Sequence, residues 1–170
     1  MAIAARLNAR ALATETSVNV VRSMWDRLSP LPGGKLVFSR LVGMMAPYTG
    51  SMRARVVELR QGYARVTLAD RHAVRNHLAS VHAIALANLV ELTGNVAVAY
   101  TLPDDARFIV AGISLDYLKK SRGTITGECH CPIITTNVKQ EYQVKVLLKN
   151  EAGDVVVEGT LRTLVGPKEL

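Results

Sequence analysis

The stretch from residue 81 to residue 100 constrains the fold of this chain more than any other. It reads VHAIALANLVELTGNVAVAY, and apolar side chains occupy nearly every face of a helix with this sequence. Such a helix is stable in water only when other elements cover it, because its apolar surface has to be removed from solvent. We therefore predict one long central helix, preceded by Ser80 as its N-cap and enclosed by the rest of the domain.

Segments of alternating apolar and polar residues lie on both sides of this helix. Residues 52–59 and 63–69 flank a short turn and predict an antiparallel hairpin. Four more strands are predicted after the helix, at residues 107–118, 123–131, 141–149 and 154–164. A single helix interrupts the strands, so the sequence predicts an α+β fold in which an antiparallel sheet of about six strands wraps around the central helix.

The first fifty residues contain no strand-like alternation. A first helix is predicted there, with an apolar face of Val18, Val21, Trp25 and Leu28. A second is predicted with an apolar face of Val37, Leu41, Met44 and Met45. We therefore expect an N-terminal helical extension at residues 1–50 and the sheet domain at residues 51–170.

Composition narrows the range of functions. Apolar residues make up 49% and charged residues 21% of the chain, and no run of about eighteen uncharged apolar residues predicts a membrane span. The net charge of +7 is compatible with a polyanion or with an anionic small ligand. Because the basic residues are dispersed and only 5% of residues are aromatic, a nucleic-acid surface is disfavoured. We expect a soluble cytoplasmic protein that binds neither nucleic acid nor membrane.

The cysteines and the N-terminus each allow two interpretations. Cys129 and Cys131 flank His130, and in a strand the two thiols share one face while the imidazole takes the other. This pattern favours two reduced core residues over a metal site or a disulfide. Three arginines against one acid in the first 22 residues are compatible with an organelle-targeting segment, but a frayed end leading into a helix is favoured.

Polar residues interrupt the apolar surface of the central helix. Asn88, Glu91 and Asn95 recur at helical spacing, and His82 lies in the first turn. About 13 Å of rise separates His82 from Glu91, so one chain does not bring the two side chains together. A two-fold dimer places the start of one helix beside the Glu of the other, which predicts two composite sites. A buried carboxylate is costly unless it is paired, hydrogen-bonded or protonated, so Glu91 has either a structural partner or a chemical role.

One motif carries a family resemblance. Asn76, His82 and Glu91, spaced as in RNHLASVHAIALANLVEL, resemble the signature of hotdog-fold acyl-CoA thioesterases. The branch it resembles most includes the phenylacetate-pathway thioesterases and their uncharacterised relatives. The resemblance covers residues 51–165, where the order of two strands, one helix and four strands also matches a hotdog fold. It implies an enzyme that uses neither a metal nor an organic cofactor.

The resemblance also implies roles for individual residues. Glu91 acts as general base or nucleophile towards the thioester carbonyl, Asn76 orients water or substrate, and the backbone N–H of Ala83 binds the oxyanion. His82 either assists directly or holds a loop by hydrogen bonds. A helix N-terminus suits an oxyanion, because it offers unpaired N–H groups, and one such donor is worth about 3 kcal/mol in the transition state. Ala83 and Ile84 replace the two glycines of the family pattern. Their side chains therefore crowd the position where the substrate carbonyl would approach the backbone.

A basic turn follows the third predicted strand. The resemblance implies that the phosphates of coenzyme A are bound, near the dimer interface, by Lys119, Lys120 and Arg122. A solvent-exposed turn with no ligand would have the same composition.

The leading hypothesis is therefore hydrolysis of an acyl-CoA thioester by a homodimer or a dimer of dimers. The alternative is a non-catalytic acyl or acyl-CoA binding protein, a sensor or carrier, on the same fold. A hydratase or dehydratase fits the spacing of the motif less well.

Overall fold

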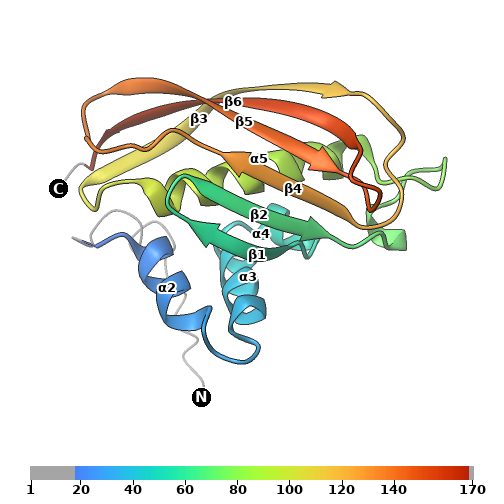
Figure 1. Ribbon diagram of the computed structural model, residues 1–170, viewed down its shortest axis with the longest axis horizontal. Helices are drawn as coiled ribbons and strands as arrows, with labels where there is room; N and C mark the ends of the chain where they lie inside the picture. Colours follow the sequence, from blue (N-terminus) through green and yellow to red (C-terminus); the bar gives the residue numbers. More distant parts are fainter. Residues whose placement is uncertain (1–17, 169–170) are drawn as a thin grey trace, which may run out of the picture.

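The computed structural model of the chain describes residues 18–168, so residues 1–17 of the predicted N-terminal extension and the last two residues lie outside it. The helices of the described part are α2 (Val20–Leu28), α3 (Gly34–Met45), α4 (Pro47–Ser51) and α5 (Ala83–Thr101), with a short 3-10 turn at His72–Val74. The strands are β1 (Arg55–Arg60), β2 (Tyr63–Leu68), β3 (Ala106–Tyr117), β4 (Ile125–His130), β5 (Gln140–Lys149) and β6 (Val155–Pro167). Figure 1 shows their arrangement.

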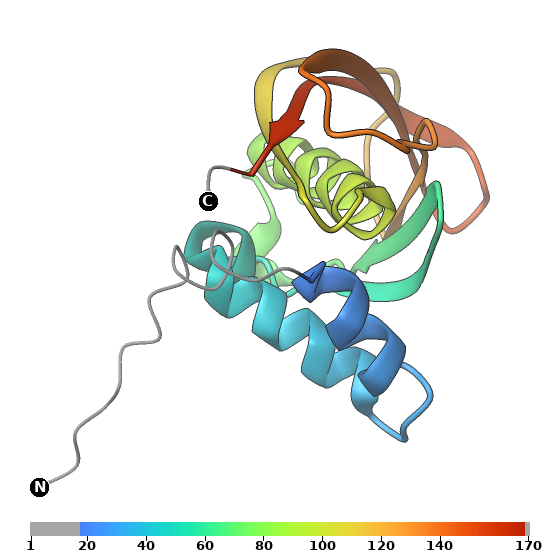
Figure 2. The same ribbon diagram turned by 90° about the vertical axis from the view of Figure 1, so that its left-hand side faces the viewer.

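The six strands form one antiparallel sheet in the order β1-β2-β4-β5-β6-β3. The sheet curves over α5, and helices α2 and α3 lie on the opposite side of α5 (Figures 1 and 2). The predicted architecture of an antiparallel sheet around a long helix is thus confirmed. Alternation in β5 explains the packing, since Val144, Val146 and Leu148 are fully buried against the helix side while the residues between them are exposed.

Glycines allow α5 to approach the sheet closely. A Cβ atom on Gly94 of α5 would lie 2.3 Å from Leu161 of β6, and one on Gly159 of β6 would lie 2.4 Å from Val90 of α5. Neither position accepts a larger side chain unless Leu161 or Val90 moves, and both of these side chains are packed in the core.

Helix α5 begins later than predicted. Its N-cap is His82, and Ser80 instead closes a turn with Asn76. The backbone N–H and the hydroxyl of Ser80 both donate to Asn76 Oδ1, and the carbonyl of Ser80 accepts from the Asn76 N–H at 2.8 Å. The prediction of Ser80 as N-cap was wrong because its side chain is already engaged in this turn.

By length and composition α5 could cross a membrane, but 56% of its apolar window is buried inside the fold. It is therefore the core helix that the all-round apolar sequence predicts.

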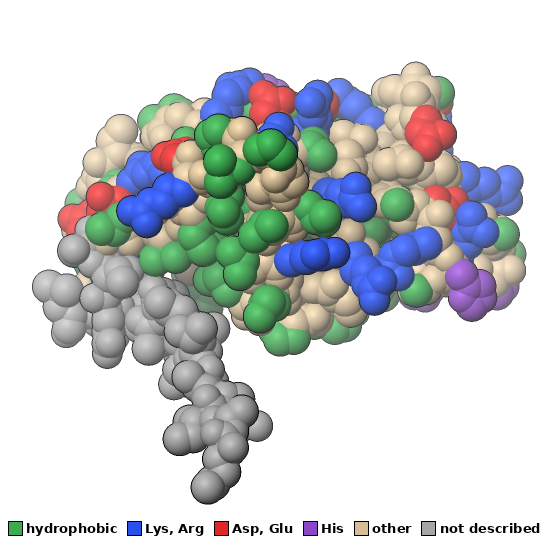
Figure 3. Space-filling model, turned by 90° about the horizontal axis from the view of Figure 1, so that it is seen from below, with side chains coloured by type: hydrophobic (Ala, Val, Ile, Leu, Met, Phe, Trp, Pro, Cys, Tyr) green, Lys and Arg blue, Asp and Glu red, His purple; other side chains and the backbone are tan. Residues whose placement is uncertain are grey.

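The buried face of α3 differs from the predicted one. Phe38 is fully buried and packs edge-on against Trp25 of α2 at 5.0 Å between ring centroids, whereas Val37, Met44 and Met45 are exposed. The face is shifted because α3 packs against α2 and also covers the outer edge of β1. Ser39 Oγ accepts from the Val56 N–H at 2.9 Å, and Lys35 Nζ donates to the Val57 carbonyl at 2.8 Å. The underside of the molecule therefore carries hydrophobic side chains beside a row of Lys and Arg (Figure 3).

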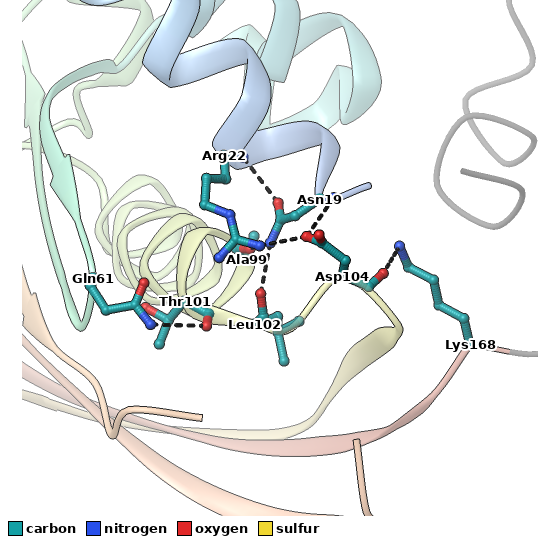
Figure 4. Close-up of polar contacts among 8 residues, drawn as sticks. All are labelled: Asn19, Arg22, Gln61, Ala99, Thr101, Leu102, Asp104 and Lys168. Carbon is teal, nitrogen blue, oxygen red and sulfur yellow. Dashed lines mark hydrogen bonds and ion pairs between the residues drawn. The ribbon is translucent and has the colours of Figure 1, made fainter. Parts of the chain in front are cut away.

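Asn19 attaches the start of α2 to the end of α5 (Figure 4). Its Oδ1 accepts from the Arg22 N–H at 3.0 Å, which caps α2. Its Nδ2 donates to the carbonyls of Ala99 at 2.6 Å and Leu102 at 3.0 Å. Asp104, just beyond α5, accepts from the Asn19 N–H and pairs with Arg22. The buried amide of Asn19 thus satisfies polar groups at the ends of two helices.

Replacing Asn19 by Ala should lower the free energy of unfolding by about 2 to 3 kcal/mol, because three buried or half-buried hydrogen bonds are lost together. Chemical denaturation followed by circular dichroism measures the change. Asn137→Ala is the matched control, since its amide makes a single exposed bond to Asp105 and its loss should cost below about 1 kcal/mol. Equal effects of the two substitutions would show that Asn19 does not join the two helices.

Candidate functional site

The start of α5 presents backbone N–H groups that have no acceptor in the described part of the chain. His82 Nδ1 accepts from the Ile84 N–H at 3.1 Å, and the His82 carbonyl accepts from the Leu86 N–H at 3.0 Å. Within residues 18–168, no acceptor binds the N–H groups of Ala83 and Ala85. These two donors lie at the positive end of the helix, where they suit an anion or a developing oxyanion.

His82 is exposed and caps the helix with its ring. Since Nδ1 accepts a hydrogen bond, the ring proton of the neutral imidazole lies on Nε2. His82 therefore combines a structural hydrogen bond on one nitrogen with a donor that remains available on the other.

A cavity of about 380 Å³ opens beside this helix start. Its lining includes His82, Ile84, Ala85 and Asn88 from the helix and its cap, together with Tyr48, Ser51, Met52, Ala73, Val74 and Arg75. Asn88 is only 7% exposed, and its Oδ1 is buried without a hydrogen-bond partner in the described part of the chain. A buried amide oxygen without a partner costs free energy, so a donor from outside the chain, either water or a ligand, would stabilise it.

Glu91 lies farther along the same helix. Ile84, Asn88, Glu91 and Asn95 are spaced by four, three and four residues, so they share one face of α5. Glu91 is half-buried, and no hydrogen bond or ion pair joins its carboxylate to any residue between 18 and 168. Eight residues of helix, about 12 Å of rise, separate it from Ala83. One chain therefore does not bring the Glu91 carboxylate to the Ala83 N–H.

The Asn76 side chain is occupied within its own turn. Its Oδ1 accepts from the Leu78 N–H at 3.0 Å and from both donors of Ser80. The side chain of Asn76 does not line the cavity at the start of α5. Any direct contact with water or substrate therefore falls to its Nδ2 group.

The predicted basic turn lies at the same end of the molecule as the start of α5. The Val81 N–H donates to the Ser121 carbonyl at 2.8 Å, and Arg122 Nη2 donates to the Leu78 carbonyl at 3.4 Å. Lys119 forms an exposed ion pair with Asp154 at 2.9 Å, while Lys120 pairs with no residue in the described range. This ion pair, through its hydrogen bond, holds the pKa of Asp154 below its ordinary value.

Tyr117 contacts the first turn of α5, which the sequence pattern did not reveal. Its hydroxyl, at the end of β3, donates to the Ala83 carbonyl at 3.0 Å and so holds the first residue of α5 in place. Burial raises the pKa of this phenol. The contact depends on the position of β3 beside α5, which no local spacing encodes. Asn88 was among the polar residues predicted at helical spacing on the central helix. The cavity beside it is also formed by α4 and residues 73–75, and this the spacing does not reveal.

The two cysteines are free and buried, as the sequence predicts. The hydrogen bond between them, together with burial, raises the pKa of the Cys129 thiol and keeps it protonated at neutral pH. The same hydrogen bond lowers the pKa of Cys131 to about 7. Within residues 18–168, no group of three His, Cys, Asp or Glu side chains is placed to hold a metal ion.

Comparison with known proteins places the fold. A family model described as a domain of unknown function, DUF4442, matches residues 34–165. A structural-genomics protein, APC5556, is 29% identical with a TM-score of 0.75, over 86% of this chain and 98% of that one. A Pseudomonas aeruginosa protein described as a probable thioesterase is 23% identical with a TM-score of 0.71, over 81% and 97% of the two chains.

A candidate thioesterase from Shewanella oneidensis is 16% identical with a TM-score of 0.68, over 80% of this chain and all of that one. No curated protein matches the sequence. These likenesses confirm the predicted hotdog fold, while the phenylacetate-pathway branch stays a prediction.

Asp70, in the loop before α5, should make the stability of the protein depend on pH. Arg75 Nε donates to Asp70 Oδ1 at 2.6 Å and the Gly123 N–H donates to Oδ2 at 3.0 Å. The hydrogen bond from Arg75 lowers the pKa of Asp70 below its ordinary value of 3.8. A depressed pKa means that the stabilisation is present above that ordinary value and is lost as pH falls through the folded-state pKa. Asp70→Asn should therefore be less stable than the wild type at pH 7, and the difference should shrink in acid. Urea denaturation of both proteins across pH checks this, and a constant difference would contradict it.

Proposed function

Because the chain belongs to the DUF4442 family and has the hotdog fold, we propose that it hydrolyses an acyl-CoA thioester in the cytoplasm. The observation that carries the proposal is the start of α5. Two N–H donors without an acceptor in residues 18–168 lie there beside a cavity lined by Asn88, whose Oδ1 is buried without a partner in the same range. Glu91, whose carboxylate has no partner in the described chain, lies on the same helix. Free, buried cysteines are compatible with a reducing compartment.

The proposed site requires two copies of the chain. Strand β3 is twelve residues long and lies at an edge of the sheet, where one row of its backbone groups has no neighbouring strand. Ile109 is 66% exposed, and Ile113, Tyr117 and Leu118 are also exposed. A long apolar edge strand is usually covered, because it otherwise pairs with other chains. Pairing of β3 with its copy across a two-fold axis sets the two α5 helices side by side, with Glu91 of one subunit near Ala83 of the other.

In this composite site Glu91 acts as general base. Its carboxylate takes a proton from a water molecule while the water oxygen bonds to the thioester carbon, and the carbonyl oxygen becomes an oxyanion that accepts from the Ala83 N–H. Collapse of this intermediate breaks the carbon–sulfur bond, and the thiolate of coenzyme A takes the proton back from Glu91. The alternative is direct attack by Glu91 and hydrolysis of the resulting anhydride by water.

Other residues bind and orient the substrate. Asn88 Oδ1 accepts from an amide N–H of the pantetheine arm, which satisfies the buried oxygen. The Nε2–H of His82 and the Nδ2 of Asn76 remain as donors for water or substrate. The phosphates of coenzyme A are bound by Lys119, Lys120 and Arg122. Lys119 leaves its exposed ion pair with Asp154 to do so.

A non-catalytic acyl-binding protein is the second candidate. The observation that favours it is Ile84, which is 53% exposed and lines the cavity at the position of a family glycine. A panel of acyl-CoA thioesters with a thiol-detecting dye separates the two candidates. Binding without release of thiol across the panel would favour the carrier.

Replacing Glu91 by Gln should reduce turnover at least about 100-fold, because the amide cannot accept the proton of water, while acyl-CoA affinity changes little. Steady-state rates and calorimetric titration measure the two quantities. Glu158→Gln is the matched control, since Glu158 is exposed on β6 and should leave turnover unchanged. Unchanged turnover of the Glu91 variant would exclude Glu91 as base or nucleophile.

Ala83→Pro should remove the proposed oxyanion donor without unfolding the helix. Proline is tolerated at the first helical position, and His82 already has the extended backbone that a following proline prefers. We expect turnover to fall about 100- to 1,000-fold with little change in melting temperature.

Mixing the two inactive variants tests the composite site directly. A heterodimer of Glu91→Gln and Ala83→Pro chains contains one intact pair of Glu91 and Ala83 N–H, so unfolding and refolding an equal mixture should restore about a quarter of the wild-type rate. No recovery, although heterodimers form, would show that each site lies within one chain.

A further inference from the structure

A second and larger cavity lies between α3, α4 and the start of β1. Its volume is about 880 Å³, and its apolar lining includes Leu36, Val42 and Leu92. It touches the cavity at the start of α5 only through the shared residue Ser51. Neither Glu91 nor Ala83 lines it.

Three arginines line this cavity without a partner. Arg40 comes from α3, Arg53 from the link between α4 and β1, and Arg55 from the first residue of β1. All three are exposed, and no carboxylate or hydrogen-bond acceptor in the described chain holds any of their guanidinium groups. Some arginines elsewhere in the same range do form ion pairs, for example Arg22 with Asp104 and Arg75 with Asp70.

The backbone around the cavity is closely constrained. A Cβ on Gly43 of α3 would lie 2.9 Å from the Cα of Gly50 in α4, so the two helices meet at a corner that only glycine permits. Arg53 has a φ of 52°, in the left-handed region that non-glycine residues seldom adopt. Three like charges thus line one cavity, and the backbone of Arg53 is held there in a strained conformation.

We propose that this cavity binds a single-chain amphipathic carboxylate, a fatty acid, with its head held by the arginines and its tail against Leu36, Val42 and Leu92. Guanidinium groups bind carboxylates through paired hydrogen bonds, and the bound carboxylate supplies the acceptor that Arg40, Arg53 and Arg55 lack within residues 18–168. The apolar lining removes the alkyl chain from water, and the volume lies in the range of small-molecule sites. The site is separate from the proposed thioester chemistry and does not depend on it.

Calorimetric titration of the full chain with decanoate tests the site. The triple variant Arg40→Gln, Arg53→Gln and Arg55→Gln should bind decanoate at least about tenfold more weakly than the wild type. The matched triple variant Arg27→Gln, Lys139→Gln and Lys145→Gln removes the same charge from exposed positions outside the cavity and should bind as the wild type does. Equal affinity of the wild type and the first variant, or equal losses in both variants, would overturn the proposal.

Two further comparisons keep the result independent of folding and of catalysis. Leu36→Glu places a carboxylate in the cavity at a residue that is 36% exposed, and it should weaken binding more than the neutral Leu36→Gln does. Decyltrimethylammonium, which has the same chain and the opposite charge, should not bind, and binding as tight as that of decanoate would overturn the proposal. Glu91→Gln should bind decanoate as the wild type does, so failure of the proposed hydrolysis and failure of this site are distinguishable.

Discussion

The requirement to cover α5 organises the whole molecule. Its sequence is apolar on nearly every face, and Leu89, Val90 and Ala97 have no exposed surface in the folded chain. The curved sheet covers one side of the helix, where Gly94 allows the close approach of β6. Helices α2 to α4 cover part of the other side, and Asn19 fixes α2 to the end of α5. Burial of one helix therefore determines where the sheet, the N-terminal helices and the two cavities lie.

The polar face of α5 is the exception to this arrangement. Asn88 has a buried oxygen without a partner, and Glu91 has no cation in the described chain to pair with. Polar groups of this kind lower stability when nothing satisfies them, so their presence on the core helix favours a role towards a ligand. The unpaired donors of Ala83 and Ala85 have the same character at the start of the helix. These unsatisfied polar groups make the protein less stable than a wholly apolar, fully bonded helix would. Such a loss of stability is expected at a site that binds a ligand.

The sequence predicted those features that depend on local patterns. Alternation located the six strands, and the apolar run located α5, because burial of one face follows from the spacing of side chains. Ser80 was misassigned because its hydroxyl bonds to Asn76, and the face of α3 was misassigned because the contact of Phe38 with Trp25 is tertiary. In the larger cavity Arg53 and Arg55 are two residues apart in the sequence, but Arg40 of α3 meets them only through packing. The same is true of Tyr117 and Ala83, so neither group could be recognised before the fold was known.

The two margins of the sheet differ in a way that limits how copies can associate. At β1 the backbone is occupied by Ser39 and Lys35 of α3, so that margin cannot accept another strand. At β3, which is twelve residues long, no strand within residues 18–168 pairs with the outer edge. A sheet with one covered edge and one free edge can pair with one other chain through its free edge. No free edge then remains for a third chain. Growth into fibres by this route stops at two chains.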